Sequence, residues 1–464
     1  MQIDIPKIVN TINGFFPVLI PCAITLLVII CILLLLKRFG FDFKKLKKSK
    51  MTHLKKLSPQ KAEGVVFGKL WNKLVCSPTK NEGHIIAFGG SGLGKTSAIL
   101  IPTLRAWRGT FLTIDIAGDI AKNVDCPNKL VYEPANPQSI PYNVFSTIDD
   151  LDDIDDQNEA LEQLALLLMP TKTKSNSDAT EFFTEEGRKI LTASLIAFYH
   201  QGEDFVEICE TINQNSWQDL FNLIDASENQ KAIEYINSFA GANEKNTAGC
   251  KQTVDKTLKL FATNEKVKKT LRRPDNGVAF APKVLEEKKV FVIIDDSRLK
   301  LYSPLLRIIT AQCMEFFSVR ENYKDPMILF ALDEFASYGK MDITEALRKL
   351  RKKNVRIFPL TQSLADLDLI YGRDERMAMM NNFSLKVVLG AADSDTQEYF
   401  SRLIGNKEVT KTSISKNANY VTTSESQQKE RIIDPEKLGR LGNKIVLLHP
   451  EGHVVLKKNF YYKK

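Results

Sequence analysis

HIIAFGGSGLGKTSAIL, residues 84–100, is the stretch that decides the fold. An apolar run is followed by a glycine-rich turn, a lysine, a threonine and a second apolar run. That order matches the pattern G-x-x-x-x-G-K-[ST] between a strand and a helix, whose backbone N–H groups wrap a triphosphate. Glycines leave room for the phosphates, and the helix N-terminus attracts the anion. The expected phosphate-binding residues are Gly89, Gly90, Ser91, Gly92, Leu93, Gly94, Lys95 and Thr96.

Lys95 and Thr96 have different expected tasks within this loop. The ammonium of Lys95 would lie on the β- and γ-phosphates, and the hydroxyl of Thr96 would ligate Mg²⁺. The sequence therefore predicts that the protein binds ATP together with Mg²⁺.

A metal-bound triphosphate also needs carboxylates. The apolar run Met327–Leu332 predicts a buried parallel strand that ends at Asp333 and Glu334. Because ligands of open α/β sheets bind at the carboxyl ends of strands, we expect this pair and the glycine-rich loop to converge from two neighbouring strand ends. Asp333 would hold the Mg²⁺ shell, and Glu334 would polarise the attacking water. The run FVIIDD at 291–296 is a second candidate, but its two aspartates would reach less far.

Polar and basic residues surround the next expected strand, Val355–Leu360. Gln362 follows it and could sense the γ-phosphate, although a polar strand cap is the alternative interpretation. In a ring, an arginine just before this strand could reach the nucleotide of the neighbouring subunit, whereas the alternative is a solvated helix face. The candidate arginines are Arg348, Arg351 and Arg356.

Strand and helix patterns alternate over residues 61–149 and 281–464, which predicts an α/β domain. Residues 150–280 show only helical spacing of apolar side chains, which predicts an all-α insertion. The Ser/Thr/Lys-rich stretch Lys407–Arg431 is expected to form a long hairpin or a flexible loop, and Pro304–Val319 a helix. The expected strands are Ile85–Phe88, Phe111–Ile114, Val290–Ile294, Met327–Leu332, Val355–Leu360, Leu385–Leu389, Ile445–Leu448 and Val454–Lys457.

The N-terminal part has the composition of a membrane anchor. Phe15–Leu36 is an uncharged apolar run that is long enough, as a helix, to cross a bilayer. The basic linker at 37–60 follows it, so the positive-inside rule places residues 1–14 outside and the bulk of the chain in the cytoplasm. The sequence thus predicts a single-pass protein of the membrane.

The basic charge of the chain is concentrated next to the expected membrane span, and the cysteines form no recognisable motif. Lys37–Lys56 holds nine basic residues and one acidic residue, a sum of +8 that equals the net charge of the whole chain. The rest of the chain is therefore neutral, and its net charge gives no sign of a nucleic-acid surface. The seven cysteines are scattered without a C-x-x-C pair, which argues against a disulfide framework or a zinc site.

Together these motifs resemble the type IV coupling proteins, the VirD4/TraG/TraD family of conjugation and type IV secretion. The similarity lies in the loop Gly89–Thr96, in Leu332–Phe335 as the L-D-E-F signature and in Leu360–Ser363 as the T-Q-S signature. The family's D-x-K-G-E motif corresponds to Asp115–Asp119, where Ala replaces Lys and Asp replaces Glu.

The resemblance implies a RecA-like P-loop domain with an all-α domain, assembled as a homo-hexamer at the bacterial inner membrane. The implied activity is ATP hydrolysis that drives a relaxase-bound single strand of DNA into a type IV secretion channel. Arg351 occupies the place of the family's inter-subunit arginine. Family members carry two transmembrane helices, whereas this sequence predicts one. The alternative function is a docking receptor for protein export that uses ATP mainly for assembly.

Overall fold

The structure is a computed structural model, and it describes residues 54–77, 83–116, 118–170, 178–274, 278–417 and 420–463. Residues 51–464 pack as one compact unit. Within the described residues, no helix is both long and apolar enough to cross a bilayer. The predicted membrane span Phe15–Leu36 and most of the basic linker lie outside the described residues, so both remain predictions.

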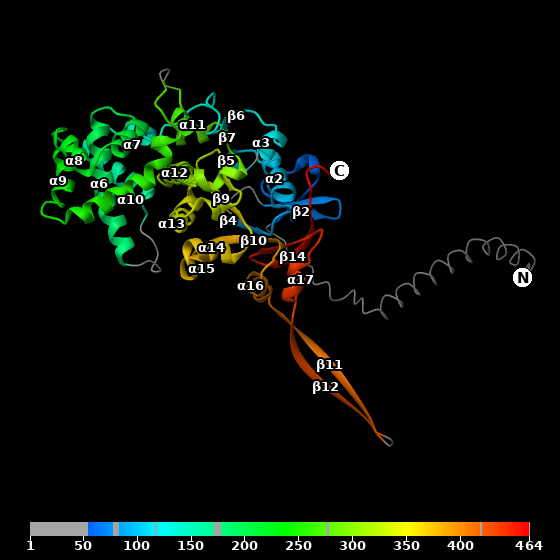
Figure 1. The fold of residues 1–464 in the computed structure, drawn as a ribbon. Helices are drawn as coiled ribbons and strands as arrows, with labels where there is room; N and C mark the ends of the chain where they lie inside the picture. The colour runs from blue at the N-terminus through cyan, green and yellow to red at the C-terminus, as the bar shows by residue number, and fades with distance from the viewer. Residues whose placement is uncertain are drawn as a thin grey trace, which may run out of the picture. The chain divides into compact units, whose positions relative to one another are not determined.

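A mixed twelve-stranded sheet forms the centre of the described chain (Figure 1). From β10 to β6 all neighbouring strands are parallel, whereas β13, β14 and β2 extend the sheet from β10 in antiparallel pairs. In spatial order the strands are β1 (Lys55–Leu57), β3 (Lys73–Cys76), β2 (Val66–Leu70), β14 (Gly452–Lys457), β13 (Lys444–His449), β10 (Phe383–Gly390), β4 (His84–Gly89), β9 (Val355–Thr361), β8 (Ile328–Leu332), β5 (Thr110–Ile116), β7 (Lys289–Ile294) and β6 (Lys129–Tyr132).

The eight strands expected from the sequence are confirmed, each to within two residues at either end, as β4, β5, β7, β8, β9, β10, β13 and β14. One expectation about their order is wrong. The strands that precede the glycine-rich loop and Asp333 are not neighbours, because β9 lies between β4 and β8. The three ends therefore form a row in which Gln362, after β9, lies between the loop and the acidic pair.

Helices cover both faces of the sheet. Alternate residues of β4 enter two separate hydrophobic cores, Ile85 and Ala87 on one face and Ile86 and Phe88 on the other. The shorter helices of the α/β part are α2 (Ile101–Ala106), α3 (Asp119–Asn123), α4 (Ser146–Asp149), α13 (Ile343–Lys349), α14 (Leu364–Tyr371), α15 (Arg373–Asn381), α16 (Ser394–Ile404) and α17 (Pro435–Gly439).

All described secondary-structure elements between residues 150 and 274 are helices. Acidic or amide side chains cap most of these helices, such as Asp153 before α5 and Asp204 in the capping box of α7. The helices are α5 (Ile154–Leu168), α6 (Asp178–His200), α7 (Phe205–Gln214), α8 (Trp217–Asp225), α9 (Gln230–Asn237), α10 (Glu244–Thr263) and α11 (Glu265–Lys269). Because they pack in one compact unit with the sheet, the predicted division at 150 and 280 stays a prediction.

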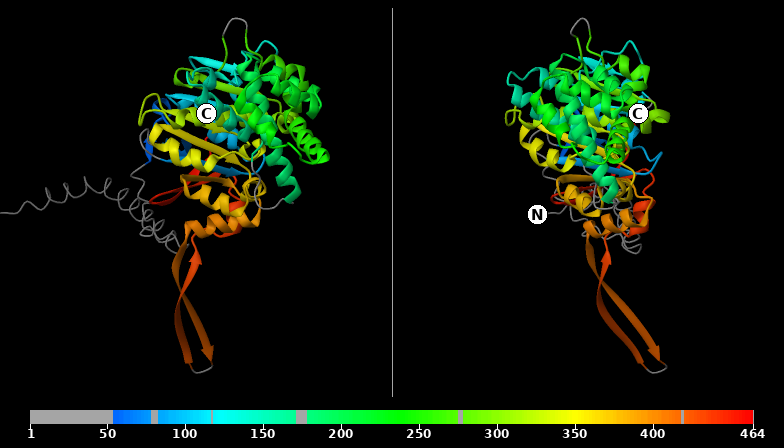
Figure 2. Two further views of the ribbon diagram at one scale, coloured as in Figure 1. Left: turned by 90° about the vertical axis from the view of Figure 1, so that its left-hand side faces the viewer. Right: turned by 60° about the vertical axis from the view of Figure 1, so that its left-hand side comes forward.

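The stretch expected as a hairpin or loop forms a long antiparallel ribbon, β11 (Asn406–Asn417) paired with β12 (Tyr420–Arg431). This ribbon is a separate two-stranded sheet, and both views of Figure 2 show it projecting from the rest of the α/β part. Of the two alternatives, a long hairpin or a flexible loop, the structure thus confirms the hairpin.

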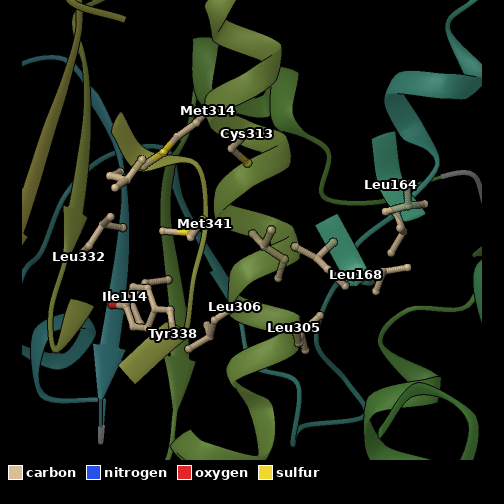
Figure 3. Packing of buried hydrophobic residues seen from close by; sticks show 14 of the residues in the cluster. Ile114, Leu164, Leu168, Leu305, Leu306, Cys313, Met314, Leu332, Tyr338 and Met341 are labelled. Carbon is tan, nitrogen blue, oxygen red and sulfur yellow. The ribbon is translucent and has the colours of Figure 1, made fainter. Parts of the chain in front are cut away.

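The long helix α12 (Leu299–Ser318) joins the sheet to the helical part. Figure 3 shows α12 between the strands that carry Ile114 and Leu332 and the helix that carries Leu164 and Leu168. The helix starts five residues before the expected Pro304. Pro304 has no N–H for the carbonyl of Lys300, and the hydroxyl of Ser303 donates to that carbonyl instead (3.1 Å).

Buried His84 joins β4 to two neighbouring elements at the amino edge of the sheet. Its Nδ1 accepts from the N–H of Ile357 (3.0 Å) in β9, and its Nε2 lies 2.8 Å from the carbonyl oxygen of Leu347 in α13. Burial lowers the pKa of His84 to about 3, and the nearby charges of Arg356 and Arg351 act in the same direction. The folded protein thus holds this imidazole neutral.

We predict that this neutral imidazole makes stability depend on pH. A histidine whose pKa is lower in the folded than in the unfolded chain contributes stability above about 6.5, and that stability is lost as the pH falls toward 3. Between pH 6 and 4, the unfolding free energy of wild type should fall by about 1.4 kcal/mol per pH unit more than that of His84→Gln. Urea unfolding at several pH values measures both slopes, and equal slopes would contradict the assignment.

Candidate nucleotide-binding site

The glycine-rich loop follows β4 at the carboxyl edge of the sheet. Gly92 (φ +73°) and Gly94 (φ +92°) have left-handed backbones, which side chains other than glycine rarely adopt. A Cβ atom added at Gly92 would meet no atom within 4 Å, so this side of the loop is open. The following helix begins with a π-helical turn, Lys95–Leu100, in which the N–H of Ile101 donates to the carbonyl of Thr96.

The side chain of Lys95 is buried inside the loop. Its ammonium donates to the carbonyl oxygen of Gly89 (2.8 Å) and forms an ion pair with Oε1 of Glu334 (3.1 Å). A buried ammonium is stable only when it is paired, so these two partners fix the position of Lys95.

Thr96 and Asp333 connect the loop to the end of β8. The Thr96 hydroxyl donates to Oδ2 of Asp333 (2.6 Å), and the N–H of Glu334 donates to Oδ1 (3.1 Å). Burial raises the pKa of Asp333 to about 6, whereas the hydrogen bond from Thr96 opposes this shift. The Thr96 hydroxyl oxygen and Oδ2 of Asp333, 2.6 Å apart, lie slightly closer together than adjacent ligands of an octahedral Mg²⁺, which are about 2.9 Å apart.

Glu334 is held in an unusual backbone conformation next to this pair. Its φ of +48° is in the left-handed region, which is strained for glutamate. The hydroxyl of Tyr338, in the 3₁₀ turn Phe335–Tyr338, donates to the carbonyl of Asp333 and so holds this corner. The Nε2 of Gln362 donates to Oε2 of Glu334 (3.2 Å), which leaves the glutamate between Lys95 and Gln362.

The second acidic pair lies elsewhere. Asp295 and Asp296 follow β7, which β5 separates from β8. Asp295 caps its own turn by accepting from the N–H of Ser297 (2.9 Å), and the hydrogen bonds from Ser297 lower the pKa of its carboxyl. Of the two pairs, the structure thus brings Asp333 and Glu334, and not Asp295 and Asp296, to the loop.

The arginines lie away from the loop of their own chain. Arg356 is buried and donates to the carbonyl of Gly83 (2.9 Å), which removes it from the three arginines that could reach another subunit. Arg348 and Arg351 are exposed near the amino end of β9, at the opposite edge of the sheet from the loop. Among the described residues, no carboxylate lies within ion-pair distance of Arg351.

Three features of this region did not follow from the sequence motifs. Tyr338 belongs to no sequence motif, and its position five residues after Asp333 was the only sign that its hydroxyl could contact the Asp333 carbonyl. Asp115 is buried and accepts from the N–H groups of Ile120 (3.0 Å) and Ala121 (2.6 Å), so it caps α3. The aromatic run 460–462 contacts the loop from the C-terminal side, and its three adjacent rings were the only signal in the sequence.

The residues present fit Mg²⁺ better than a metal that needs an all-protein site. No group of three or more His, Cys, Asp or Glu side chains in the described ranges could hold a metal ion. Mg²⁺ is commonly bound by one or two protein oxygens, with waters and phosphates as the other ligands. Thr96 and Asp333 supply such oxygens.

The raised pKa of Asp333 leads to a prediction about stability. A carboxyl with a higher pKa in the folded than in the unfolded chain destabilises the fold above pH 6, and this cost disappears as the pH falls below 3.8. The neutral Asp333→Asn should therefore stabilise the nucleotide-free protein at pH 8 by about 1–3 kcal/mol. Thermal and urea unfolding at pH 8 and pH 4 check this; a gain that is absent, or equal at both pH values, would disprove it.

Comparison with known sequences identifies relatives over most of the chain. The family model described as Type IV secretory system Conjugative DNA transfer matches residues 40–464. Protein VirD4 of Rhizobium rhizogenes is 24% identical over 425 residues, which cover 86% of this chain and 62% of that protein. The probable conjugal transfer protein TraG of Sinorhizobium fredii is 25% identical over 372 residues, which cover 76% of this chain and 57% of that protein. The chain thus spans about three fifths of the length of these relatives.

Solved structures with a similar fold are those of the conjugative coupling protein TrwB. One of them is the trigonal form of TrwBdeltaN70 in complex with sulphate, which has a TM-score of 0.69 at 19% sequence identity. The matched region covers 90% of this chain and 92% of the TrwB chain. The complex of TrwB with ADP and Mg²⁺ has a TM-score of 0.67 at 18% sequence identity, and the matched region covers 90% of this chain and 93% of the TrwB chain. These TM-scores and coverages show that the two proteins share an α/β fold with a mixed sheet. On the family match over residues 40–464, the chain belongs to the type IV coupling proteins of conjugative DNA transfer.

Proposed function

We propose that the protein is a membrane-anchored ATPase that couples a relaxase-bound single strand of DNA to a type IV secretion channel and drives DNA transfer by ATP hydrolysis. One observation carries the proposal. Glu334 contacts both Lys95 and Gln362. Beside it, Thr96 contacts Asp333. Residues from the ends of β4, β9 and β8 therefore form one polar cluster beside an open glycine-rich loop.

The loop and Lys95 would bind the phosphates of ATP, and Thr96 and Asp333 would hold Mg²⁺. Bound Mg²⁺ would neutralise the charge that develops on the phosphates. TrwB in complex with ADP and Mg²⁺, or with a non-hydrolysable ATP analogue, shares this fold and supports the choice of ligands. Glycines at positions 92 and 94 leave the backbone N–H groups accessible to an anion.

Glu334 would act as the base that orients and polarises water. In the nucleotide-free protein its carboxylate is held by the ammonium of Lys95. When phosphate oxygens take over that ammonium, Glu334 keeps only its contact with Gln362 and becomes available to accept a proton from water. Gln362, which contacts Glu334 and is exposed to the site, would report the presence of the γ-phosphate.

Arg351 would complete the site of a neighbouring subunit. It is exposed at the edge of the sheet opposite to the loop, so it cannot reach the nucleotide of its own chain. A ring in which the amino edge of one sheet faces the carboxyl edge of the next would bring Arg351 to that nucleotide as an arginine finger. A head-to-tail contact of this kind closes into a ring when the rotation between subunits permits it, and we propose a homo-hexamer.

The family and the N-terminal sequence support a proposal for the partners and the location. The family description names conjugative DNA transfer and the TraG relative is named a probable conjugal transfer protein, which supports single-stranded DNA, a relaxase and channel proteins as partners. The apolar run 15–36 and the basic linker after it support a single-pass anchor in the bacterial inner membrane with the bulk of the chain in the cytoplasm.

A pair of substitutions separates binding from hydrolysis. Lys95→Ala should weaken Mg²⁺–ATP binding at least tenfold, because it removes the buried cation of the phosphate site. Glu334→Gln keeps the shape of the side chain but not its basicity, so it should bind ATP and lose about 100-fold or more of its turnover. Calorimetry and phosphate release, with and without single-stranded DNA, measure both effects. Normal turnover in Glu334→Gln, or no stimulation of wild type by DNA, would refute the motor.

Mixing two inactive variants tests whether Arg351 acts between subunits. Arg351→Ala retains Glu334, and Glu334→Gln retains Arg351, so a mixed ring contains interfaces that have both residues intact. We expect each variant alone to be inactive and the equimolar mixture to recover up to about a quarter of the wild-type rate, since random mixing pairs them correctly at one interface in four. Arg348→Ala is the matched control and should retain activity. No recovery on mixing would contradict an action in trans.

A further inference from the structure

The C-terminal segment after β14 returns to the glycine-rich loop. The N–H of Tyr461 donates to the carbonyl of Ser97 (3.0 Å), directly after Lys95 and Thr96. The ring of Phe460 lies against Gly94, where an added Cβ atom would be only 3.0 Å from its Cε1. The segment and the phosphate-binding loop are thus in direct contact.

The three aromatic rings of this segment have different surroundings. Tyr461 packs against the core below the loop, and Arg105 lies 5.2 Å from the centroid of its ring. Phe460 is half-buried, whereas Tyr462 is 59% exposed, and the centroids of these two rings are 5.4 Å apart. Tyr461 therefore anchors the segment, while Phe460 and Tyr462 lie at the surface beside the loop, where the ammonium of Lys463 is 4.9 Å and 5.9 Å from the centroids of their rings.

The order of strands sets the direction of a bound nucleotide. Glu334 and Gln362 lie on the β9 and β8 side of β4, and Lys95 points toward them. The C-terminal segment leaves β14, on the other side of β4 beyond β10 and β13. A triphosphate with its γ end at Lys95 and Glu334 would therefore have its nucleoside end on the side where the aromatic rings lie.

We infer that Phe460 and Tyr462 form the nucleobase subsite of this pocket and hold the base by stacking. The inference rests on the proposed ATPase function, and it adds which residues recognise the nucleoside. Every base has a π-face, so a site built from aromatic rings binds bases with little discrimination among them. Loss of base–aromatic stacking commonly weakens binding by about 5- to 150-fold.

The test compares a ligand that has a base with one that has only phosphates. Calorimetry of the full chain with Mg²⁺ measures the binding of ATP and of inorganic tripolyphosphate to wild type, to Tyr462→Leu and to Phe460→Leu combined with Tyr462→Leu. Tyr323→Leu is the matched control, because Tyr323 is 56% exposed and lies in the turn before β8, at the opposite edge of the sheet. Tyr462 is so exposed that its single replacement should not affect folding.

We expect the double variant to bind ATP about tenfold or more weakly and tripolyphosphate within twofold of wild type, with a smaller loss of ATP affinity in Tyr462→Leu alone. The control should bind both ligands as wild type does. Equal losses for the two ligands, or no loss of ATP affinity, would overturn the nucleobase subsite while leaving the ATPase intact. If wild type binds neither ligand, the proposed function itself fails and the inference with it.

Discussion

The buried ammonium of Lys95 is the constraint on which the rest of the site depends. A charge without water is tolerated only beside compensating groups, and here these are the carbonyl of Gly89 and the carboxylate of Glu334. The two partners come from the ends of β4 and β8, which are far apart in sequence. The sheet must therefore hold these ends at one edge, with β9 between them, and Gln362 necessarily lies in the gap. The strained backbone of Glu334, held by Tyr338, is a local consequence of the same requirement.

The site is physically joined to the helical part of the chain. Arg307 in α12 donates to the carbonyl of Leu168 at the end of α5 (3.2 Å) and lies next to Gly339, just after the turn that follows Glu334. The end of α5 is also tied to α6, because Arg188 donates to the carbonyl of Met169 (2.8 Å). The acidic corner and the end of α5 therefore cannot move independently without breaking these contacts.

Sequence patterns predicted the strands best where burial is complete. Apolar runs such as Ile328–Leu332 are buried on both faces by helices, so their composition alone reveals them. The short strands β1, β3 and β2 at one end of the sheet and β6 at the other end were not predicted, because they have mixed composition and are defined by pairing. The place of β9 between β4 and β8 also could not be derived, since strand order depends on long crossovers rather than on local sequence. The longer side chain of Glu334 favoured the correct acidic pair, whereas the distance of each pair from the loop depends on the same strand order.

The central claim is that the glycine-rich loop and the acidic pair hold one magnesium-bound triphosphate between them. The most direct measurement is a structure of the full chain determined with Mg²⁺ and a non-hydrolysable ATP analogue. We expect a metal ion at Thr96 and Asp333, and a γ-phosphate in contact with Lys95, which has moved away from Glu334. A nucleotide bound elsewhere, or a Lys95–Glu334 ion pair unchanged beside an empty loop, would contradict it.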